Sequence, residues 1–285
     1  MVRTIRITKM HGNGNDFVLV DEFSRIVIPE DKKPAFVRAD CHRRFGVGAD
    51  GVLFVQKSDV ADARFRYFNS DGSEAEMCGN GIRCFSRYVV EEGHVPKYAP
   101  EKLKVETLAG VLELEVYQGW WVKVDMGRPR FRREEIPALT DVWGYEVEFN
   151  GKKYKLYAAN TGVPHAVIFV DSLDFDIIPL AKRVRYMDIF PEGINVNFAK
   201  VESRDRIGVR TYERGVEDET LSCGTGSVAV AAIANKLGIA DSEVEVITKG
   251  GVLKIEVGVG DTAYMTGKAS RVFDGELRMD ELYEV

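Results

Sequence analysis

Hydrophobic and polar residues recur in the same order in the two halves of the chain. Segments 63–68 (ARFRYF) and 207–212 (IGVRTY) alternate between apolar and polar residues, as half-buried strands do. Each is followed by a polar loop, a Cys-Gly pair and a segment with helical spacing. The second helical segment, SVAVAAIANKLG at 227–238, is apolar nearly all round, which predicts a buried helix.

Glycine marks the end of both predicted helices. The first helix has one apolar face, formed by Ile82, Phe85, Tyr88 and Val89. Gly93 and Gly238 each lie fifteen residues after the cysteine of their half, where a C-terminal glycine cap is expected. Segments 111–116 and 252–257 then alternate after short glycine turns, which predicts a β-hairpin in each half.

Three pairs of matching segments indicate that a whole domain is duplicated. The matches lie in the same order in both halves: 15–21 with 165–171, 66–81 with 210–226, and 107–116 with 248–257. We therefore expect an α+β fold of two pseudo-symmetric domains, each a mainly antiparallel β-sheet or barrel wrapped around a central helix. The first domain is expected at residues 1–128, with residues 273–285 packing back onto it, and the second at residues 129–272.

Composition and charge fit a folded, soluble protein and argue against several partners. The 285 residues are 45% hydrophobic and 29% charged, and the formal net charge of −6 disfavours a nucleic-acid partner. No apolar run reaches the ~20 residues that span a bilayer, and the N-terminus lacks the apolar core of a signal peptide. We expect no membrane partner and a cytoplasmic location, in which the four cysteines stay reduced. Scattered histidines and the absence of CxxC predict no metal site.

Cysteine occupies the equivalent position twice, at the predicted start of a helix. Cys78 stands in MCGNG and Cys223 in SCGTG. A helix N-terminus favours a thiolate and can hold a carboxylate, because it carries unpaired N–H groups and a partial positive charge. If the two domains face each other, one thiolate can remove a proton from an α-carbon while the other thiol returns one from the opposite face. This pattern predicts a cofactor-independent amino-acid epimerase.

The other two cysteines have a structural interpretation. Cys41 and Cys84 are expected in the core, the usual place of a cysteine outside disulfides. Cys84 lies within the first predicted helix and has no partner in the repeat. A phosphate loop, the alternative for the Cys-Gly sites, is not supported, because neither GxxxxGK[ST] nor GxGxxG follows a strand.

Five motifs spread over the whole chain give it a close resemblance to the diaminopimelate epimerase family. In order they are KMHGNGNDFVLVD, FNSDGSEAEMCGNGIRCF, NTGVPHAV, GINVNF and YERGVEDETLSCGTGS. The resemblance implies an isomerase that needs neither pyridoxal phosphate nor another cofactor. Its substrates would be LL- and meso-diaminopimelate, on the route to lysine and peptidoglycan. A homodimer is also implied.

The resemblance assigns roles to individual residues. The two catalytic thiols match Cys78 and Cys223, and His165 and Glu213 match residues that tune the protonation of these thiols. The reacting carboxylate would lie on backbone N–H groups of the pairs Gly79-Asn80 and Gly224-Thr225. The distal amino-acid end of the substrate needs a cation for its carboxylate and acceptors for its ammonium group. The matching positions there are Asn15, Asn69, Asn195, Glu213 and Arg214.

Three departures from the family pattern concern recognition of the distal end. Val163 stands where many members have asparagine, and Asn160 could substitute for that asparagine from nearby. Gly51 stands where glutamine is common. The segment from Glu213 to Cys223 is one residue longer than in many members.

Three other functions compete with this interpretation. A proline or hydroxyproline racemase of the same fold would usually carry histidine after MCG, where this chain has Asn80, and would not need Arg214. A non-enzymatic or isomerase relative would lack the thiol pair. A redox switch would act through a disulfide between Cys78 and Cys223, which we interpret as an oxidation artefact that blocks the site.

Overall fold

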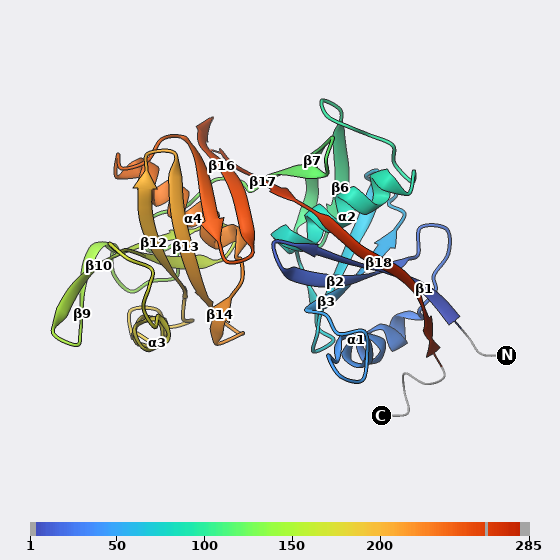
Figure 1. Cartoon of the computed structure of the whole chain (residues 1–285), viewed down its shortest axis with the longest axis horizontal. Helices are drawn as coiled ribbons and strands as arrows, with labels where there is room; N and C mark the ends of the chain where they lie inside the picture. The colour runs from blue at the N-terminus through green and yellow to red at the C-terminus, as the bar shows by residue number, and fades with distance from the viewer. Residues whose placement is uncertain (1–3, 260–261, 280–285) are drawn as a thin grey trace. The chain divides into compact units, whose positions relative to one another are not determined.

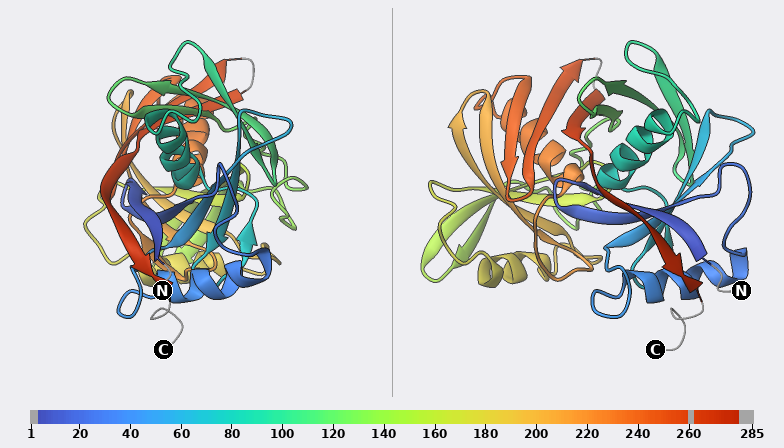
Figure 2. Two further views of the ribbon diagram at one scale, coloured as in Figure 1. Left: turned by 90° about the vertical axis from the view of Figure 1, so that its right-hand side faces the viewer. Right: turned by 45° about the vertical axis from the view of Figure 1, so that its right-hand side comes forward.

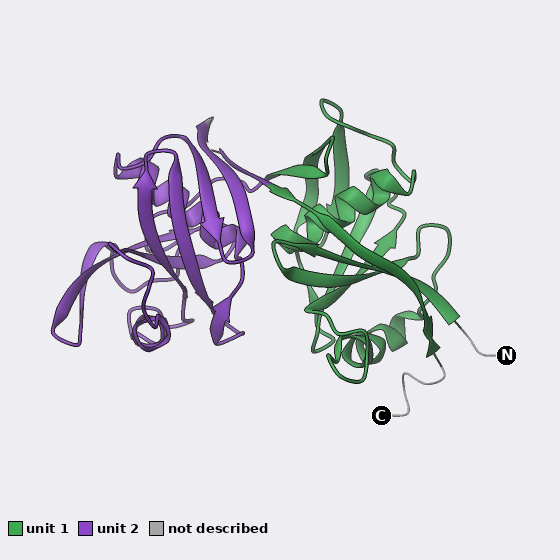
Figure 3. Cartoon of the chain, in the orientation of Figure 1, with its two compact units in different colours: residues 1–124, 267–285 green, residues 125–266 purple. Residues whose placement is uncertain are grey.

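The computed structural model describes residues 4–259 and 262–279 (Figure 1). The chain divides into two compact units, shown in different colours in Figure 3. Unit 1 contains residues 1–124 and 267–285, and unit 2 contains residues 125–266. Each unit combines strands with a few helices, so the expected α+β class is confirmed. Residues 280–285 of the expected C-terminal return lie outside the described residues.

Unit 1 is built on a mixed sheet that begins with a hairpin. β1 pairs antiparallel with β2, β2 runs parallel to β3, and β3 pairs antiparallel with β4. β4 then runs parallel to β6, which forms a hairpin with β7, and the late strand β18 returns to pair with β1. The elements are β1 (Thr4–Gly12), β2 (Asn15–Asp21), η1 (Glu30–Lys32), α1 (Lys33–Cys41), β3 (Gly51–Gln56), β4 (Ala63–Asn69), β5 (Glu74–Ala75), α2 (Gly79–Glu91), β6 (Lys102–Thr107), β7 (Gly110–Tyr117), β8 (Trp121–Asp125) and β18 (Ser270–Arg278).

Unit 2 repeats this sequence of pairings. β10 pairs antiparallel with β11, β11 runs parallel to β12, and β12 pairs antiparallel with β13. β13 then runs parallel to β15, which forms a hairpin with β16. The shared topology confirms the duplication inferred from the repeats. The elements are β9 (Trp143–Phe149), β10 (Lys152–Asn160), β11 (Pro164–Phe169), α3 (Ile178–Arg185), β12 (Asn195–Ser203), β13 (Arg206–Glu213), β14 (Asp218–Thr220), α4 (Gly224–Lys236), β15 (Glu243–Thr248), β16 (Gly251–Val259) and β17 (Thr262–Lys268).

The two predicted hairpins are closed in the same way. Thr107 pairs with Gly110 and Thr248 with Gly251, and in each case the threonine hydroxyl donates to the glycine carbonyl, at 2.8 and 2.9 Å. Gly110 has a φ of 116° and Gly251 a φ of 132°, a backbone conformation that glycine adopts readily. The repeated sequence therefore specifies the same turn twice.

A helix lies at the centre of each unit. In unit 1, α2 packs against strands β1 to β4 and β7, and in unit 2, α4 packs against β10 to β13 and the hairpin β15–β16 (Figure 2). α2 buries its predicted apolar face, whereas α4 is buried along most of its length because it has few polar side chains. Gly93 and Gly238, with φ of 75° and 72°, follow the two helices as predicted.

Candidate active site

Both repeat cysteines are the N-cap residues of the central helices. Cys78 precedes α2 with φ −141° and ψ 120°, and Cys223 precedes α4 with φ −119° and ψ 114°. This extended backbone places each sulfur beside the first turn of its helix, where the N–H groups have no acceptor within the helix. The prediction that both cysteines lie at helix starts is confirmed. Each start combines a sulfur, a set of N–H donors and a partial positive charge.

The Cys78 sulfur lies among amides of unit 1. It accepts from the backbone N–H of Gly81 at 3.5 Å and donates to Asn15 Oδ1 at 3.6 Å. Asn80 Nδ2 donates to the same Oδ1 at 3.2 Å, and Asn15 Nδ2 donates to Asp50 at 2.6 Å. The start of α2 and the start of β2 thus bring together three residues that sequence analysis assigned to the site.

Arg83, which sequence analysis did not single out, is a buried cation on the first turns of α2. Its side chain is fully buried, and Nη2 donates to Asn13 at 2.8 Å and to Asn80 Oδ1 at 2.9 Å. Burial lowers the pKa of Arg83 to about 10, so the guanidinium stays charged at neutral pH. The equivalent position of α4 is Val228, so the two repeats differ in charge here.

The Cys223 sulfur is connected to a buried histidine in unit 2. Sγ lies 3.4 Å from Thr225 Oγ1, and the same hydroxyl lies 2.9 Å from His165 Nε2. Asn197 Nδ2 lies 3.1 Å from the other ring nitrogen of His165. Burial, together with the positive charge of Arg214, lowers the pKa of His165 to about 3, so the ring is neutral over the physiological range. Sequence analysis had assigned His165 and Thr225 to the site but had missed Asn197.

Three predicted residues of the distal-end set gather at the ends of β12 and β13. Asn195 Oδ1 accepts from the backbone N–H of Arg214 at 2.8 Å, and Asn195 Nδ2 donates to Pro164 O at 2.9 Å. The Arg214 guanidinium donates to the carbonyl of Glu192 at 3.1 Å. Glu213, the last residue of β13, accepts from the Thr220 hydroxyl at 2.6 Å.

Asn69, the remaining asparagine of the distal-end set, is the last residue of β4 in unit 1. Its side chain donates to Ser73 Oγ at 3.0 Å, and its carbonyl accepts from Gly72 across a tight turn at 2.8 Å. These contacts are those of a turn residue.

The structure shows the surroundings of three residues named in the departures from the family pattern, and it gives a steric reason for one of them, Gly51. The Asn160 amide is engaged with backbone, since Nδ2 donates to Glu135 O at 2.7 Å and Oδ1 accepts from Gly162 N at 3.0 Å. Val163, the position without asparagine, is 36% exposed. At Gly51, a Cβ would lie 2.4 Å from the Phe68 carbonyl oxygen and 2.5 Å from the Tyr67 ring. A side chain at position 51 would therefore require the neighbouring strand to shift.

Cys41 and Cys84 are core residues, as predicted. Cys41 is 4% exposed and Cys84 fully buried, and burial raises the pKa of each thiol to about 12. Neither thiol can therefore supply a thiolate at neutral pH.

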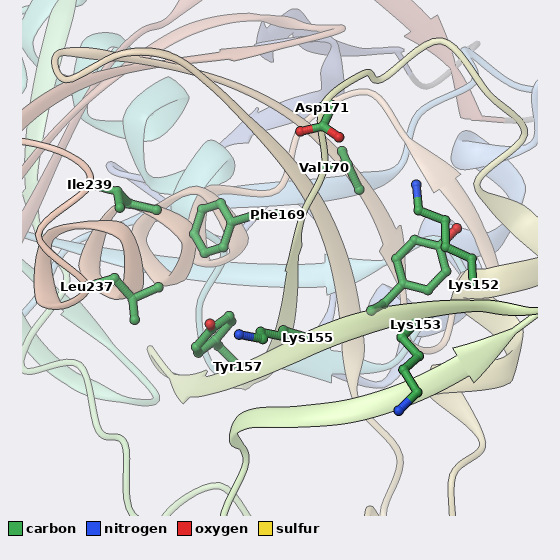
Figure 4. Close-up of a pocket in the computed structure, with 10 residues that line it drawn as sticks. Lys152, Lys153, Lys155, Tyr157, Phe169, Val170, Asp171, Leu237 and Ile239 are labelled. Atoms are coloured by element: carbon green, nitrogen blue, oxygen red, sulfur yellow. The ribbon is translucent and has the colours of Figure 1, made fainter.

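The part of the chain that the structure describes has neither a potential metal site nor a membrane-spanning helix. Residues 4–259 and 262–279 contain no group of three or more histidine, cysteine, aspartate or glutamate residues that could hold a metal ion. Over the same described residues, no helix is long and apolar enough to cross a membrane. A surface cavity of about 440 Å³ in unit 2 is lined by β10 and β11 residues such as Lys155 and Phe169 and by Leu237, and none of the predicted site residues reaches it (Figure 4).

Comparison with known proteins identifies the family. The sequence model described as diaminopimelate epimerase matches residues 7–132 and 157–272. The diaminopimelate epimerase of Archaeoglobus fulgidus is 74% identical over 98% of this chain and 98% of its own length. The chain belongs to the diaminopimelate epimerase family. It is therefore an isomerase, an amino-acid epimerase of lysine biosynthesis.

A further relative agrees with the family assignment, and two solved structures share the fold. The diaminopimelate epimerase of Methanocella arvoryzae is 53% identical over 97% of this chain and 98% of its own length. Among solved structures, a PhzF-family protein of Bacillus anthracis is similar with a TM-score of 0.68 and 19% identity, covering 96% of this chain and 99% of that one. A probable proline racemase of Agrobacterium radiobacter gives a TM-score of 0.69 at 16% identity, covering 98% and 94%. At such identities these structures show only that the fold is shared, and they confirm the expected fold.

Proposed function

We propose that this epimerase interconverts LL-2,6-diaminopimelate and meso-diaminopimelate by moving a proton between Cys78 and Cys223 and the substrate α-carbon. Membership of the family gives the reaction. The observation that supports the two-thiol chemistry is that both cysteines occupy the N-cap position of the equivalent central helix of a duplicated unit.

The reaction needs one thiolate and one thiol at a time. The thiolate takes the α-proton, and the C–H electron pair moves into the α-carboxylate to give an enolate-like anion. The second thiol then donates its proton to the opposite face, which inverts the centre and leaves the second sulfur as the thiolate. Because the two sulfurs exchange roles, the same pair serves the reverse reaction.

The helix starts supply the electrostatic part of this proposal. Backbone N–H groups of Gly79-Asn80 and Gly224-Thr225 would hold the reacting carboxylate and stabilise the negative charge that develops on it. The partial positive charge of each helix N-terminus acts on the same group. Since these donors are fixed by the fold, they need no reorganisation during proton transfer.

The distal end of the substrate is assigned to polar side chains of both units. Arg214 would bind the distal carboxylate, and Glu213 with the asparagines Asn15, Asn69 and Asn195 would accept from or orient the ammonium group. The cluster of Asn195, Glu213 and Arg214 at the ends of β12 and β13 supports this assignment for unit 2. His165 and Glu213 are further proposed to tune the protonation of the thiols.

The remaining features of the proposal follow the family and the composition. The enzyme is assigned to the cytoplasm, uses no metal or organic cofactor, binds neither nucleic acid nor membrane, and forms a homodimer. Size-exclusion chromatography with light scattering tests the dimer directly, since a monomer at all concentrations would contradict it.

Single replacement of each repeat cysteine tests the two-thiol chemistry. Cys78→Ala and Cys223→Ala should each lower kcat/KM with LL-diaminopimelate by at least about 10²–10⁴-fold, the contribution of one general acid or base. Cys41→Ala, which alters a core thiol, is the matched control and should keep most of the activity. Circular dichroism checks that the variants fold. Near-normal turnover by either Cys78→Ala or Cys223→Ala would contradict the mechanism, and L-proline as an alternative substrate separates this function from the racemases of the same fold.

A further inference from the structure

A series of hydrogen bonds within unit 2 ends at the Cys223 sulfur, and the structure defines the donor and acceptor of each bond in turn. The series runs through Asn197, His165 and Thr225. Asn197 and His165 are fully buried, so no solvent competes for their hydrogen bonds. The orientation of the series therefore follows from which atoms can only donate and which can only accept.

The first link fixes the Asn197 amide. Asn197 Nδ2 lies 3.0 Å from the carbonyl oxygen of Ala166, which can only accept, and Asn197 Oδ1 accepts from the Thr211 hydroxyl at 2.9 Å. A flipped amide would place two oxygens together at Ala166. The strand register maintains this geometry, because Asn197 pairs with Val167 on β11 and with Thr211 on β13.

The second link fixes the tautomer of His165. The other proton of Asn197 Nδ2 points to His165 Nδ1 at 3.1 Å, so Nδ1 must carry the lone pair. Burial and the charge of Arg214 keep the ring neutral by lowering its pKa to about 3. A neutral ring with a bare Nδ1 has its proton on Nε2.

The third hydrogen bond in the series determines that the Thr225 hydroxyl donates to the Cys223 sulfur. Nε2–H donates to Thr225 Oγ1 at 2.9 Å, so this hydroxyl has its own proton left for Cys223 Sγ at 3.4 Å. A sulfur that receives a hydrogen bond is stabilised as the thiolate. Two other titratable groups of the predicted site lie at the end of β13, a strand that packs against α4. Glu213, the last residue of β13, accepts from the Thr220 hydroxyl, and Arg214, the next residue, donates to the Glu192 carbonyl.

We propose that Asn197 is a positioning residue of the epimerase, which holds His165 as the Nε2–H tautomer so that Thr225 donates to the Cys223 sulfur. The inference rests on the proposed role of Cys223 as an acid and base. Close packing supports it: a Cβ at Gly226, on the first turn of α4, would lie 2.4 Å from Asn197 Oδ1 and 3.3 Å from the His165 ring. The glycine lets the helix start lie directly on the Asn197–His165 pair.

Cys78 provides an internal control for the hydrogen-bond series Asn197–His165–Thr225–Cys223. It belongs to unit 1 and has different partners, since its thiol donates to Asn15 Oδ1 at 3.6 Å. At the position equivalent to Thr225, the first repeat has Asn80, which has no hydroxyl. A change in this series should therefore alter the thiolate population of Cys223 and leave that of Cys78 unchanged.

Nitrogen NMR of histidine in the wild-type protein tests the first part. The spectrum of ¹⁵N-labelled enzyme should show His165 with a protonated Nε2 and a bare Nδ1, unchanged between pH 5 and 9. An Nδ1–H tautomer, or an imidazolium in this range, would overturn the proposal. This measurement needs no variant, so it decides the question even if a substitution prevents folding.

Alkylation of the two sulfurs tests the second part. The pH dependence of the reaction with iodoacetamide is followed by mass spectrometry of the Cys78 and Cys223 peptides from the same sample. Thr225→Val should move the Cys223 midpoint up by about one pH unit, a tenfold loss of thiolate at fixed pH, whereas Thr225→Ser should stay near wild type. Asn197→Leu should move it in the same direction by a smaller amount.

The outcomes separate this proposal from the proposed function. If the pH dependence of Cys223 alkylation is unchanged in Asn197→Leu but shifted in Thr225→Val, Asn197 has no positioning role. Equal shifts of Cys78 and Cys223 would show a general change of the fold rather than a positioning role. Neither readout uses turnover, so the two-thiol chemistry is judged independently by Cys78→Ala and Cys223→Ala.

Discussion

Asp40 on α1 is a carboxylate that the fold has removed from water. Its side chain is fully buried, and within the described residues neither carboxylate oxygen has a hydrogen-bond partner. Burial raises the pKa of Asp40 from 3.8 to about 7, and the nearby charge of Lys9 offsets only part of that effect. Asp40 should therefore carry a proton in the folded protein over most of the acidic range.

The raised pKa makes the free energy of unfolding depend on pH. A group whose pKa is raised by folding stabilises the folded state below its unfolded pKa, and this stabilisation is lost as pH rises through the folded value. The window here is from about pH 4 to pH 7. A difference of about three pKa units at 1.36 kcal/mol each corresponds to about 4 kcal/mol across that window.

Asp40→Asn removes the ionisation while keeping the shape of the side chain. An asparagine amide buried without partners costs about 1–3 kcal/mol, so the variant should be the less stable protein at pH 4. At pH 8 it should be the more stable one, because it avoids the cost of burying a charge. The difference in unfolding free energy between variant and wild type should thus change by about 4 kcal/mol between these pH values.

Urea unfolding with a reducing agent, at half-unit steps from pH 4 to pH 8.5, measures this difference. Asp31→Asn is the matched control, because it removes the same charge from a side chain that is 76% exposed and next to the same helix. Its curve should run parallel to that of the wild type. A parallel curve for Asp40→Asn as well would refute the assignment of a buried, protonated Asp40.

Two further substitutions test the candidate site. Arg214→Ala should raise KM for diaminopimelate by about 10- to 100-fold, because the variant loses one pair of charge-assisted hydrogen bonds. The control is Arg204→Ala, which removes an exposed ion pair with Asp241 and should leave KM unchanged in the same assay. Gly226→Ala should destabilise the protein by about 1–3 kcal/mol, because its Cβ would clash with Asn197. The control is Gly81→Ala, at the equivalent position of the other repeat, where the added Cβ would make ordinary contacts at 3.4–3.5 Å. Thermal unfolding should therefore show a smaller loss of stability for Gly81→Ala than for Gly226→Ala. Equal losses of stability would contradict the clash.

The duplicated architecture could be predicted because its signals are local. The alternation in 63–68 and 207–212, the Cys-Gly helix starts and the terminal glycines are each contained in a short stretch of sequence, and each occurs twice. The helices α1 and α3 were not predicted, although they occupy the same place in both units, between the first hairpin and the next strand. Their sequences are short and differ between the two units, so the repeat does not reveal them.

The buried partners of the site depend on pairings that the sequence does not show. Asn197 reaches His165 only because β11 and β12 run parallel in one register, and it reaches Thr211 through the antiparallel register of β12 and β13. Arg83 has a weak sequence signal, a charge within an otherwise apolar part of α2. Its bond to Asn80 is local to α2, whereas its bond to Asn13 becomes visible only when the turn between β1 and β2 is placed beside that helix.

Turnover in D₂O tests most directly whether two separate groups exchange the α-proton. LL-diaminopimelate is converted to a few per cent in D₂O, and deuterium at the α-carbon is measured by mass spectrometry in both the product and the recovered substrate. If one thiolate removes the proton and the other thiol delivers one, the meso product carries one solvent deuterium and the recovered substrate carries none. Equal deuterium in substrate and product, or a product that keeps the original proton, would contradict the two-thiol account.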